Sequence, residues 1–134
     1  TERIARSRAD QVLHIDDGNV GAARAAGADA AIAWGADWLS FTDADSTVPS
    51  GWLDDQLRHE REGADLVLGT VRPAGDGFSP GERRAWARGH GSGRAIGNVY
   101  GANLGIRTSV YLEAGGFRAL RAHEDQDLVR RARP

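Results

Sequence analysis

The chain of 134 residues contains no cysteine and no methionine. The absence of cysteine excludes disulfides, thiolate metal sites and thiol nucleophiles, and it is compatible with a reducing compartment. No apolar run approaches the roughly 20 residues that a membrane-spanning helix needs, and Thr1 opens no signal peptide. We therefore expect a cytoplasmic protein without a membrane span in this chain, with peripheral attachment to the inner face of the membrane as an alternative.

The chain also lacks an excess of either charge. Its 17 basic and 19 acidic side chains give a formal net charge of -2, which is too small a field to hold nucleic acid or an anionic membrane. Nucleic acid is therefore not an expected partner. The chain has 40% hydrophobic and 27% charged residues, which is the balance of a globular protein with one domain or most of one.

Apolar runs of strand type alternate with helical patterns along the chain. Strands are expected at 11–15, 37–43, 64–71 and 102–107. Helices are expected at 2–9, between the cap Asn19 and Gly35, from Ser50, at 108–114 and from His123. This alternation predicts an α/β fold in which helices cover a mixed, mainly parallel sheet. Because an α/β domain usually opens with a strand, the chain is expected to lack its first strand-helix unit.

Several side chains are assigned to the interior by their spacing. The expected packing residues are the small side chains Ala22, Ala23, Ala26, Ala30 and Ala33, the stripe Trp52, Leu53 and Leu57, and the rings of Trp34 and Trp38. Residues 115–117, Gly-Gly-Phe, predict a turn that buries a ring. Residues 72–97 are rich in glycine and predict a mobile loop with one helical turn near Trp86, which closes over a ligand as a lid.

Two aspartates stand one residue apart in the stretch WLSFTDADSTVPSGW, residues 38–52. A strand that ends in Asp43-Ala44-Asp45 sends both carboxylates to the same side, at the strand end where α/β sheets bind ligands. Two such oxygen ligands suit Mg²⁺ or Mn²⁺, with water and phosphate oxygens completing the coordination. The alternative is a solvated turn in which Asp43 caps a backbone amide. A calcium loop is excluded, because Val48 stands where an EF-hand needs glycine.

A second acidic cluster, His123-Glu124-Asp125-Gln126-Asp127, begins the last expected helix. The simplest interpretation is helix-terminal charge, because unsatisfied amides and the helix dipole favour ionised acids there. Asp127 lies about 200° round the helix from Asp125, so the two carboxylates should not share a site. Arg24, among the small residues of its helix, is expected to be solvated, with a contact to phosphate as the alternative.

Three motifs together carry a family resemblance. They are D-x-D at 43–45, G-A-N-L-x-x-R at 101–107 with G-G-F at 115–117, and E-D-x-D-L at 124–128. In that order and spacing the chain resembles the family 2 glycosyltransferases of GT-A fold, with an actinobacterial look, over nearly its whole length. The resemblance implies a partial, Rossmann-like GT-A catalytic domain over residues 1–134. The segment that holds the base and ribose of the nucleotide sugar in similar proteins is missing from this chain.

The resemblance also implies site roles. Asp45 would ligate the Mg²⁺ or Mn²⁺ that bridges the donor diphosphate, and Asp43 would reach the ribose or a metal-bound water. The residue that matches the base of similar enzymes, which takes the proton from the acceptor hydroxyl, is Asp125, with Glu124 beside it. Gly101 and Ala102 would leave room for a sugar.

Asn103 offers that sugar a donor and an acceptor. The alternative for this motif, residues 101–103, is a tight turn into a strand.

The expected activity is transfer of a sugar from a UDP- or GDP-sugar to an acceptor hydroxyl, metal-dependent and inverting. A retaining transferase of similar fold and a non-catalytic domain that binds nucleotide sugar stay open as alternatives. A dinucleotide-binding oxidoreductase is disfavoured, because Gly18, Gly21 and Gly27 lack the G-x-G-x-x-G spacing. A nucleotidyltransferase is disfavoured because the chain shows no Gly/Arg/Lys-rich phosphate loop near its start.

Overall fold

The computed structural model describes residues 2–72, 79–90 and 99–133. Its elements, in chain order, are α1 (Glu2–Arg6), α2 (Val20–Ala33), β1 (Trp38–Phe41), α3 (Trp52–Arg61), β2 (Leu66–Leu68), α4 (Pro80–His90), the 3-10 helix η1 (Gly101–Asn103), β3 (Leu104–Arg107), α5 (Thr108–Glu113) and α6 (Glu124–Ala132). Within these ranges no helix is both long and apolar enough to cross a membrane.

The three strands form one sheet in the order β1-β3-β2, with β3 antiparallel to both neighbours. Ile106 of β3 pairs with Leu39 on one side and with Leu66 on the other. The α/β class is therefore confirmed. The expected mainly parallel sheet is not found among the described residues, because the strand that returns through η1 enters between β1 and β2 in the opposite direction.

The strand expected at 11–15 is absent from the structure. A strand needs a hydrogen-bonding neighbour and cover for its apolar face, and Leu13 is 42% exposed. In the sheet as described, β1 pairs with β3 and not with this segment.

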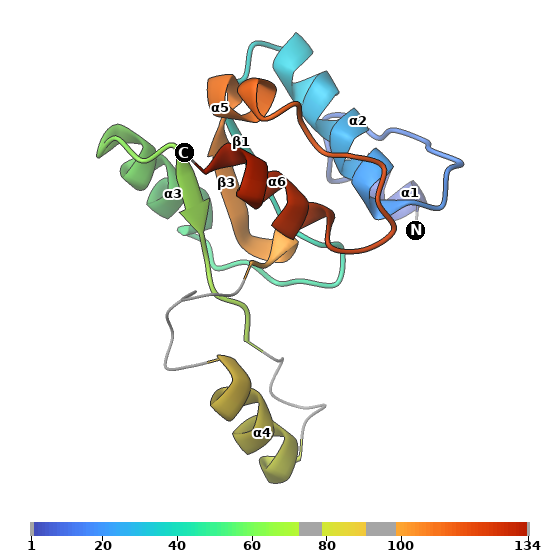
Figure 1. The fold of residues 1–134 in the computed structure, drawn as a ribbon. Coiled ribbons are helices and arrows are strands. Elements are labelled where there is room, and N and C mark those ends of the chain that lie inside the picture. Colours follow the sequence, from blue (N-terminus) through green and yellow to red (C-terminus); the bar gives the residue numbers. More distant parts are fainter. Residues whose placement is uncertain (1, 73–78, 91–98, 134) are drawn as a thin grey trace.

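Side chains alternate between the two faces of the sheet. Leu39, Leu104 and Ile106 are buried on the face covered by α2, α5 and α6, and α3 lies on the other face (Figure 1). The core is completed by Ala28, Tyr111, Phe117, Leu128 and Val129. Helices α2 and α6 therefore contact each other on this face of the sheet.

Helix α2 begins where the sequence predicts. The side chain of Asn19 caps it by accepting from the backbone N–H of Ala22 at 3.0 Å, and Gly35 adopts a positive φ of 84° beyond its end. The predicted packing face is wrong, however, since Ala23 is exposed and Ala28 is buried. The residues of α2 that pack against the core are instead Ala25, Ala28, Ala31 and Ile32, and Gly21 lies directly on the backbone of Arg118 and Leu120, where any Cβ would overlap the chain.

The apolar stripe predicted for α3 is also wrong. Leu53 and Leu57 are 53% and 37% exposed, whereas Gln56 is 2% exposed. Its Oε1 accepts from Trp38 Nε1 at 3.1 Å and from Ser40 Oγ at 3.0 Å, so α3 is joined to the sheet by polar bonds. Of the expected core rings, that of Trp34 is 67% exposed.

The turn at 115–117 is confirmed. Gly115 and Gly116 have positive φ values of 75° and 65°, and Phe117 is 7% exposed. The rings of Phe117 and Phe41 pack edge to face, with 5.0 Å between their centroids. The backbone N–H of Phe117 donates to the Tyr111 hydroxyl at 3.1 Å. These contacts hold the segment that leads into α6.

Where one helical turn was expected near Trp86, α4 is a helix of eleven residues. Ser79 and Glu82 form a reciprocal cap, with N–H to carboxylate and N–H to hydroxyl distances of 2.8 and 3.3 Å. Residues 73–78 and 91–97 of the expected lid lie outside the described residues. Closure of this segment stays a prediction.

Candidate active site

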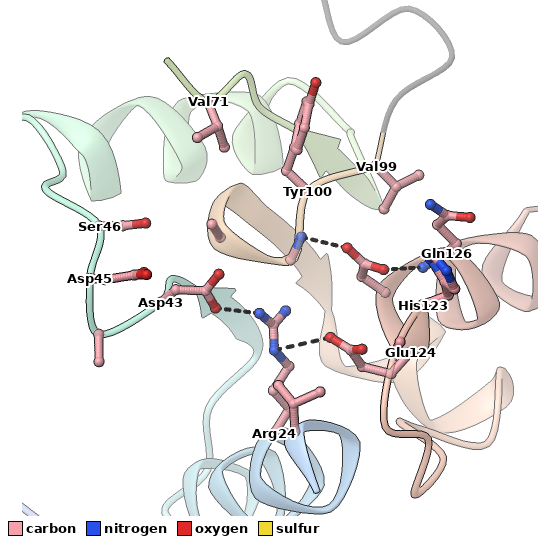
Figure 2. A pocket seen from close by; sticks show the side chains of 16 residues that line it. Arg24, Asp43, Asp45, Ser46, Val71, Val99, Tyr100, His123, Glu124 and Gln126 are labelled. Carbon is pink, nitrogen blue, oxygen red and sulfur yellow. Dashed lines mark hydrogen bonds and ion pairs between the residues drawn. The ribbon is translucent and has the colours of Figure 1, made fainter. Parts of the chain in front are cut away.

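A cavity of about 850 Å³ opens where β1, η1 and α6 meet. Its walls come from the turn after β1 (43–46), the chain entering η1 (99–102) and the start of α6 (122–126), together with Val20, Arg24 and Val71. Figure 2 shows Asp43, Asp45 and Ser46 on one side of Arg24 and His123, Glu124 and Gln126 on the other. The two acidic motifs of the sequence therefore border the same cavity.

Asp43 and Asp45 reach the cavity by a turn. Strand β1 ends at Phe41, and the backbone N–H of Ser46 donates to the carbonyl of Asp43 at 3.0 Å. The expected strand alternation is thus not what gathers the carboxylates. The side chain of Asp43 is 42% exposed and its Oδ1 is bonded to Arg24 Nη2. Asp45 is exposed and makes no hydrogen bond or ion pair with the part of the chain that the structure describes.

The first turn of α6 brings Asp125 to the opposite wall. Its Oδ2 accepts from the backbone N–H of Gly101 at 2.8 Å, and its Oδ1 accepts from that of Gln126 at 2.7 Å. Before it stands His123, which has a left-handed backbone with φ of 60° and makes no side-chain cap to the helix. The carboxylate of Asp125 is therefore held in a fixed orientation by two amides.

The two aspartates of α6 point to different places, as expected. Asp127 accepts from Arg131 Nη2 at 2.7 Å and lies 3.6 Å from Arg118. The hydrogen bond from Arg131, aided by the nearby positive charges, holds the pKa of the Asp127 carboxyl below its usual range. Arg131 Nη2 also donates to the carbonyl of Gly116 at 2.7 Å. Asp127 therefore anchors α6 to the turn at 115–117 and is not part of the cavity wall.

The motif at 101–103 is divided between two places. Gly101 and Ala102 line the cavity, whereas Asn103 does not. Asn103 Oδ1 accepts from Trp52 Nε1 at 2.9 Å, and its Nδ2 donates to the carbonyl of Thr70 at 3.0 Å. The amide of Asn103 is thus engaged in joining α3 to the chain after β2.

Arg24 is not solvated, contrary to the expectation from sequence. Its side chain is 11% exposed, its Nη2 bonds Asp43, and its Nε lies 3.5 Å from Glu124 Oε1 (Figure 2). Glu124 is itself 5% exposed. The sequence feature that could have revealed the burial of Arg24 is its position as a single arginine within VGAARAAGADA. A cation on a helix that packs through small residues needs a carboxylate partner.

Comparison with known protein families matches residues 1–127 to glycosyl transferase family 2. The chain belongs to this family. It is therefore a glycosyltransferase, and membership implies the GT-A fold and transfer from a nucleotide-sugar donor to an acceptor. Comparisons with curated proteins and with solved structures find no significant match.

The carboxylates of Asp43 and Asp45 are the side chains of this turn that could hold a divalent cation. The described residues contain no group of three or more His, Asp or Glu side chains placed to hold a metal by themselves. Asp45 is unengaged among those residues, and Asp43 has one oxygen bonded to Arg24. Mg²⁺ is commonly held by one or two carboxylates with phosphate oxygens and water as the other ligands, so this sparse set suits it.

Proposed function

We propose that this glycosyltransferase transfers a sugar from a UDP- or GDP-sugar to an acceptor hydroxyl by a metal-dependent, inverting displacement, and that residues 1–134 are part of its GT-A catalytic domain. The observation that carries the proposal is the placement of the Asp43/Asp45 turn and of Asp125 on the same cavity of about 850 Å³. An inverting displacement needs a donor-holding group and a base on opposite sides of the sugar.

On the donor side, Asp45 is the main ligand of Mg²⁺ or Mn²⁺, because of the two carboxylates of this turn it is the one without a partner among the described residues. Asp43 supplies its second oxygen to the cation or to the donor ribose, since Arg24 engages the first. The cation would offset the negative charge that grows on the leaving diphosphate, a contribution of several kcal/mol.

On the acceptor side, Asp125 is the base. Each of its oxygens accepts one backbone N–H, which leaves one lone pair on each for the acceptor's proton. Positioned base catalysis of this kind contributes roughly 10²–10⁴-fold. Glu124 is the weaker candidate, because it is buried and faces Arg24. Gly101 and Ala102 give the sugar a wall without bulky side chains.

A thermal-shift panel of UDP- and GDP-sugars, each with and without Mn²⁺, tests donor binding. We expect one sugar nucleotide to raise the unfolding temperature only when Mn²⁺ is present. Equal stabilisation with and without Mn²⁺ would contradict the role of the cation.

The stereochemistry of transfer is tested with that donor and simple sugar acceptors, by following the anomeric proton of the product by NMR. Inversion of the anomeric configuration supports the base role of a carboxylate. Retention of the anomeric configuration would favour a retaining transferase of similar fold. Donor binding without any transfer or hydrolysis would favour a non-catalytic nucleotide-sugar-binding domain.

A further inference from the structure

The side chain of Arg24 is largely enclosed at the cavity wall, with 11% of its surface exposed. Its guanidinium contacts carboxylates from two distant segments, Asp43 after β1 and Glu124 at the start of α6. Its Cζ also lies 5.8 Å from the centre of the Phe117 ring. A guanidinium offers donors in several directions of one plane, so a single side chain can hold both groups at once.

The same side chain occupies the space beside Gly101. A Cβ built on Gly101 would overlap the guanidinium of Arg24, so glycine at this position makes room for the arginine. The backbone N–H of Gly101 in turn holds Asp125. Arg24 therefore meets the donor-side turn, η1 and the first turn of α6 at one point (Figure 2).

The charges around Arg24 make this part of the cavity wall sensitive to the loss of the arginine. Asp43 and Glu124 are two negative groups brought to one cation, and Glu124 is almost fully buried. Removing the positive charge of Arg24 leaves the buried carboxylate of Glu124 without a compensating charge, and it leaves two like charges facing each other. The two acidic segments would then separate.

We propose that Arg24 is a positioning residue of the glycosyltransferase, which sets the separation of the Asp43 turn from the Asp125 helix start. The inference rests on the proposed function, in which these two walls hold the donor and the base. Arg24 acts through Asp43, Glu124 and Gly101 and does not itself take part in the reaction. A misplacement of about 1 Å between reacting groups can reduce a rate by about 10²-fold.

The kinetic test uses Arg24→Gln and Arg24→Lys. We expect Arg24→Gln to lower kcat for transfer by about 10- to 100-fold with donor KM changed less than about threefold, since the base is displaced and the donor carboxylate Asp45 is kept. Arg24→Lys should recover only part of kcat, because one ammonium cannot reach both carboxylates. A raised donor KM with unchanged kcat would place Arg24 on the donor and overturn the proposal.

Arg107→Gln is the matched control. Arg107 also pairs with two carboxylates, those of Glu60 and Asp65 at 2.6 and 2.8 Å, but lies outside the cavity. Its loss should lower stability and leave kcat of the folded protein within about twofold. An equal fall of kcat in both variants would reduce Arg24 to a general stabilising role and contradict the proposal.

Amide hydrogen exchange supplies a readout that does not depend on transfer. Arg24→Gln should speed exchange at the Gly101 amide and in the first turn of α6, whereas Arg107→Gln should not. Unchanged exchange at these amides in Arg24→Gln would overturn the proposal. If wild-type protein shows no transfer but Arg24→Gln shows the expected exchange, the proposed function fails and the positioning role stands. Should Arg24→Gln not fold, Arg24→Lys gives the same comparison of exchange and kinetics.

Discussion

The backbone N–H of Gly101 donates to Oδ2 of Asp125 at 2.8 Å, which ties the 3-10 helix η1 to the first turn of α6. Residues 24 positions apart in sequence thus share one hydrogen bond at the cavity wall. Because η1 leads directly into the central strand β3, the carboxylate of Asp125 is oriented by the most buried part of the sheet.

This relationship predicts that Gly101→Ala is harmful. The added methyl group overlaps Arg24, so either the guanidinium or η1 must move, and we expect a loss of about 1–3 kcal/mol in the free energy of unfolding together with reduced transfer. Gly27→Ala is the control, because a Cβ there meets nothing within 4 Å in the middle of α2, and it should stabilise by roughly 0.5–1 kcal/mol. Urea unfolding of both variants measures the difference. A neutral Gly101→Ala would show that the overlap is relieved without cost.

Asp45→Ala tests the donor side. The side chain of Asp45 is exposed and carries no packing, so the fold should stay intact while Mn²⁺-dependent binding of a nucleoside diphosphate is lost. Titration calorimetry with UDP and GDP, with and without Mn²⁺, measures the change. Unchanged affinity in Asp45→Ala would remove this residue from the set of metal ligands.

Asp127→Asn should affect stability in a pH-dependent way. The folded-state pKa of Asp127 is lowered by Arg131, so the carboxylate contributes stability that is fully present above its unfolded pKa near 3.8 and is lost as the pH falls through the lower folded value. The unfolding temperature of Asp127→Asn should therefore lie below that of the wild type at pH 5–7, and the two should converge only as the pH falls below 3.8 and through the lower folded pKa. A difference that grows on acidification would contradict the ion pair with Arg131.

Local sequence signals predicted much of the fold. The Asn19 cap, the glycine turn before Phe117 and the acids that begin α6 are all decided by backbone chemistry within a few residues, and the structure confirms them. The Ser79/Glu82 cap of α4 was equally local, but the glycine and proline content of residues 72–97 led to the expectation of a loop.

The missed features depend on contacts between distant segments. Gln56 is buried because Trp38 and Ser40 of β1 donate to it, and no pattern within α3 reveals that partner. Likewise, the enclosure of Arg24 requires Glu124, one hundred residues away along the chain. The direction of the strands could not be derived from their spacing, because alternation of strands and helices does not say which strand enters between two others.

For the candidate site, the sequence predicted that residues of the two acidic motifs belong to one site, but neither how they are held there nor that Asn103 lies outside the cavity wall. The two acidic motifs do border one cavity, and Asp125 and Asp127 do diverge. However, Asp43 and Asp45 are gathered by a turn, and Asn103 is engaged with Trp52 and the chain after β2. The roles of these residues in catalysis and metal binding stay predictions.

The most direct test of the account compares transfer rates of Asp125→Asn and Asp127→Asn. Asp125→Asn removes the proton acceptor and keeps the side-chain shape, so kcat should fall by roughly 10²-fold or more with donor affinity nearly preserved. Asp127→Asn, which loses an anchor of α6 outside the cavity, should keep kcat within about tenfold at a temperature where it is folded. If Asp127→Asn is instead the crippled variant, or if Asp125→Asn transfers sugar at the wild-type rate, Asp125 is not the base.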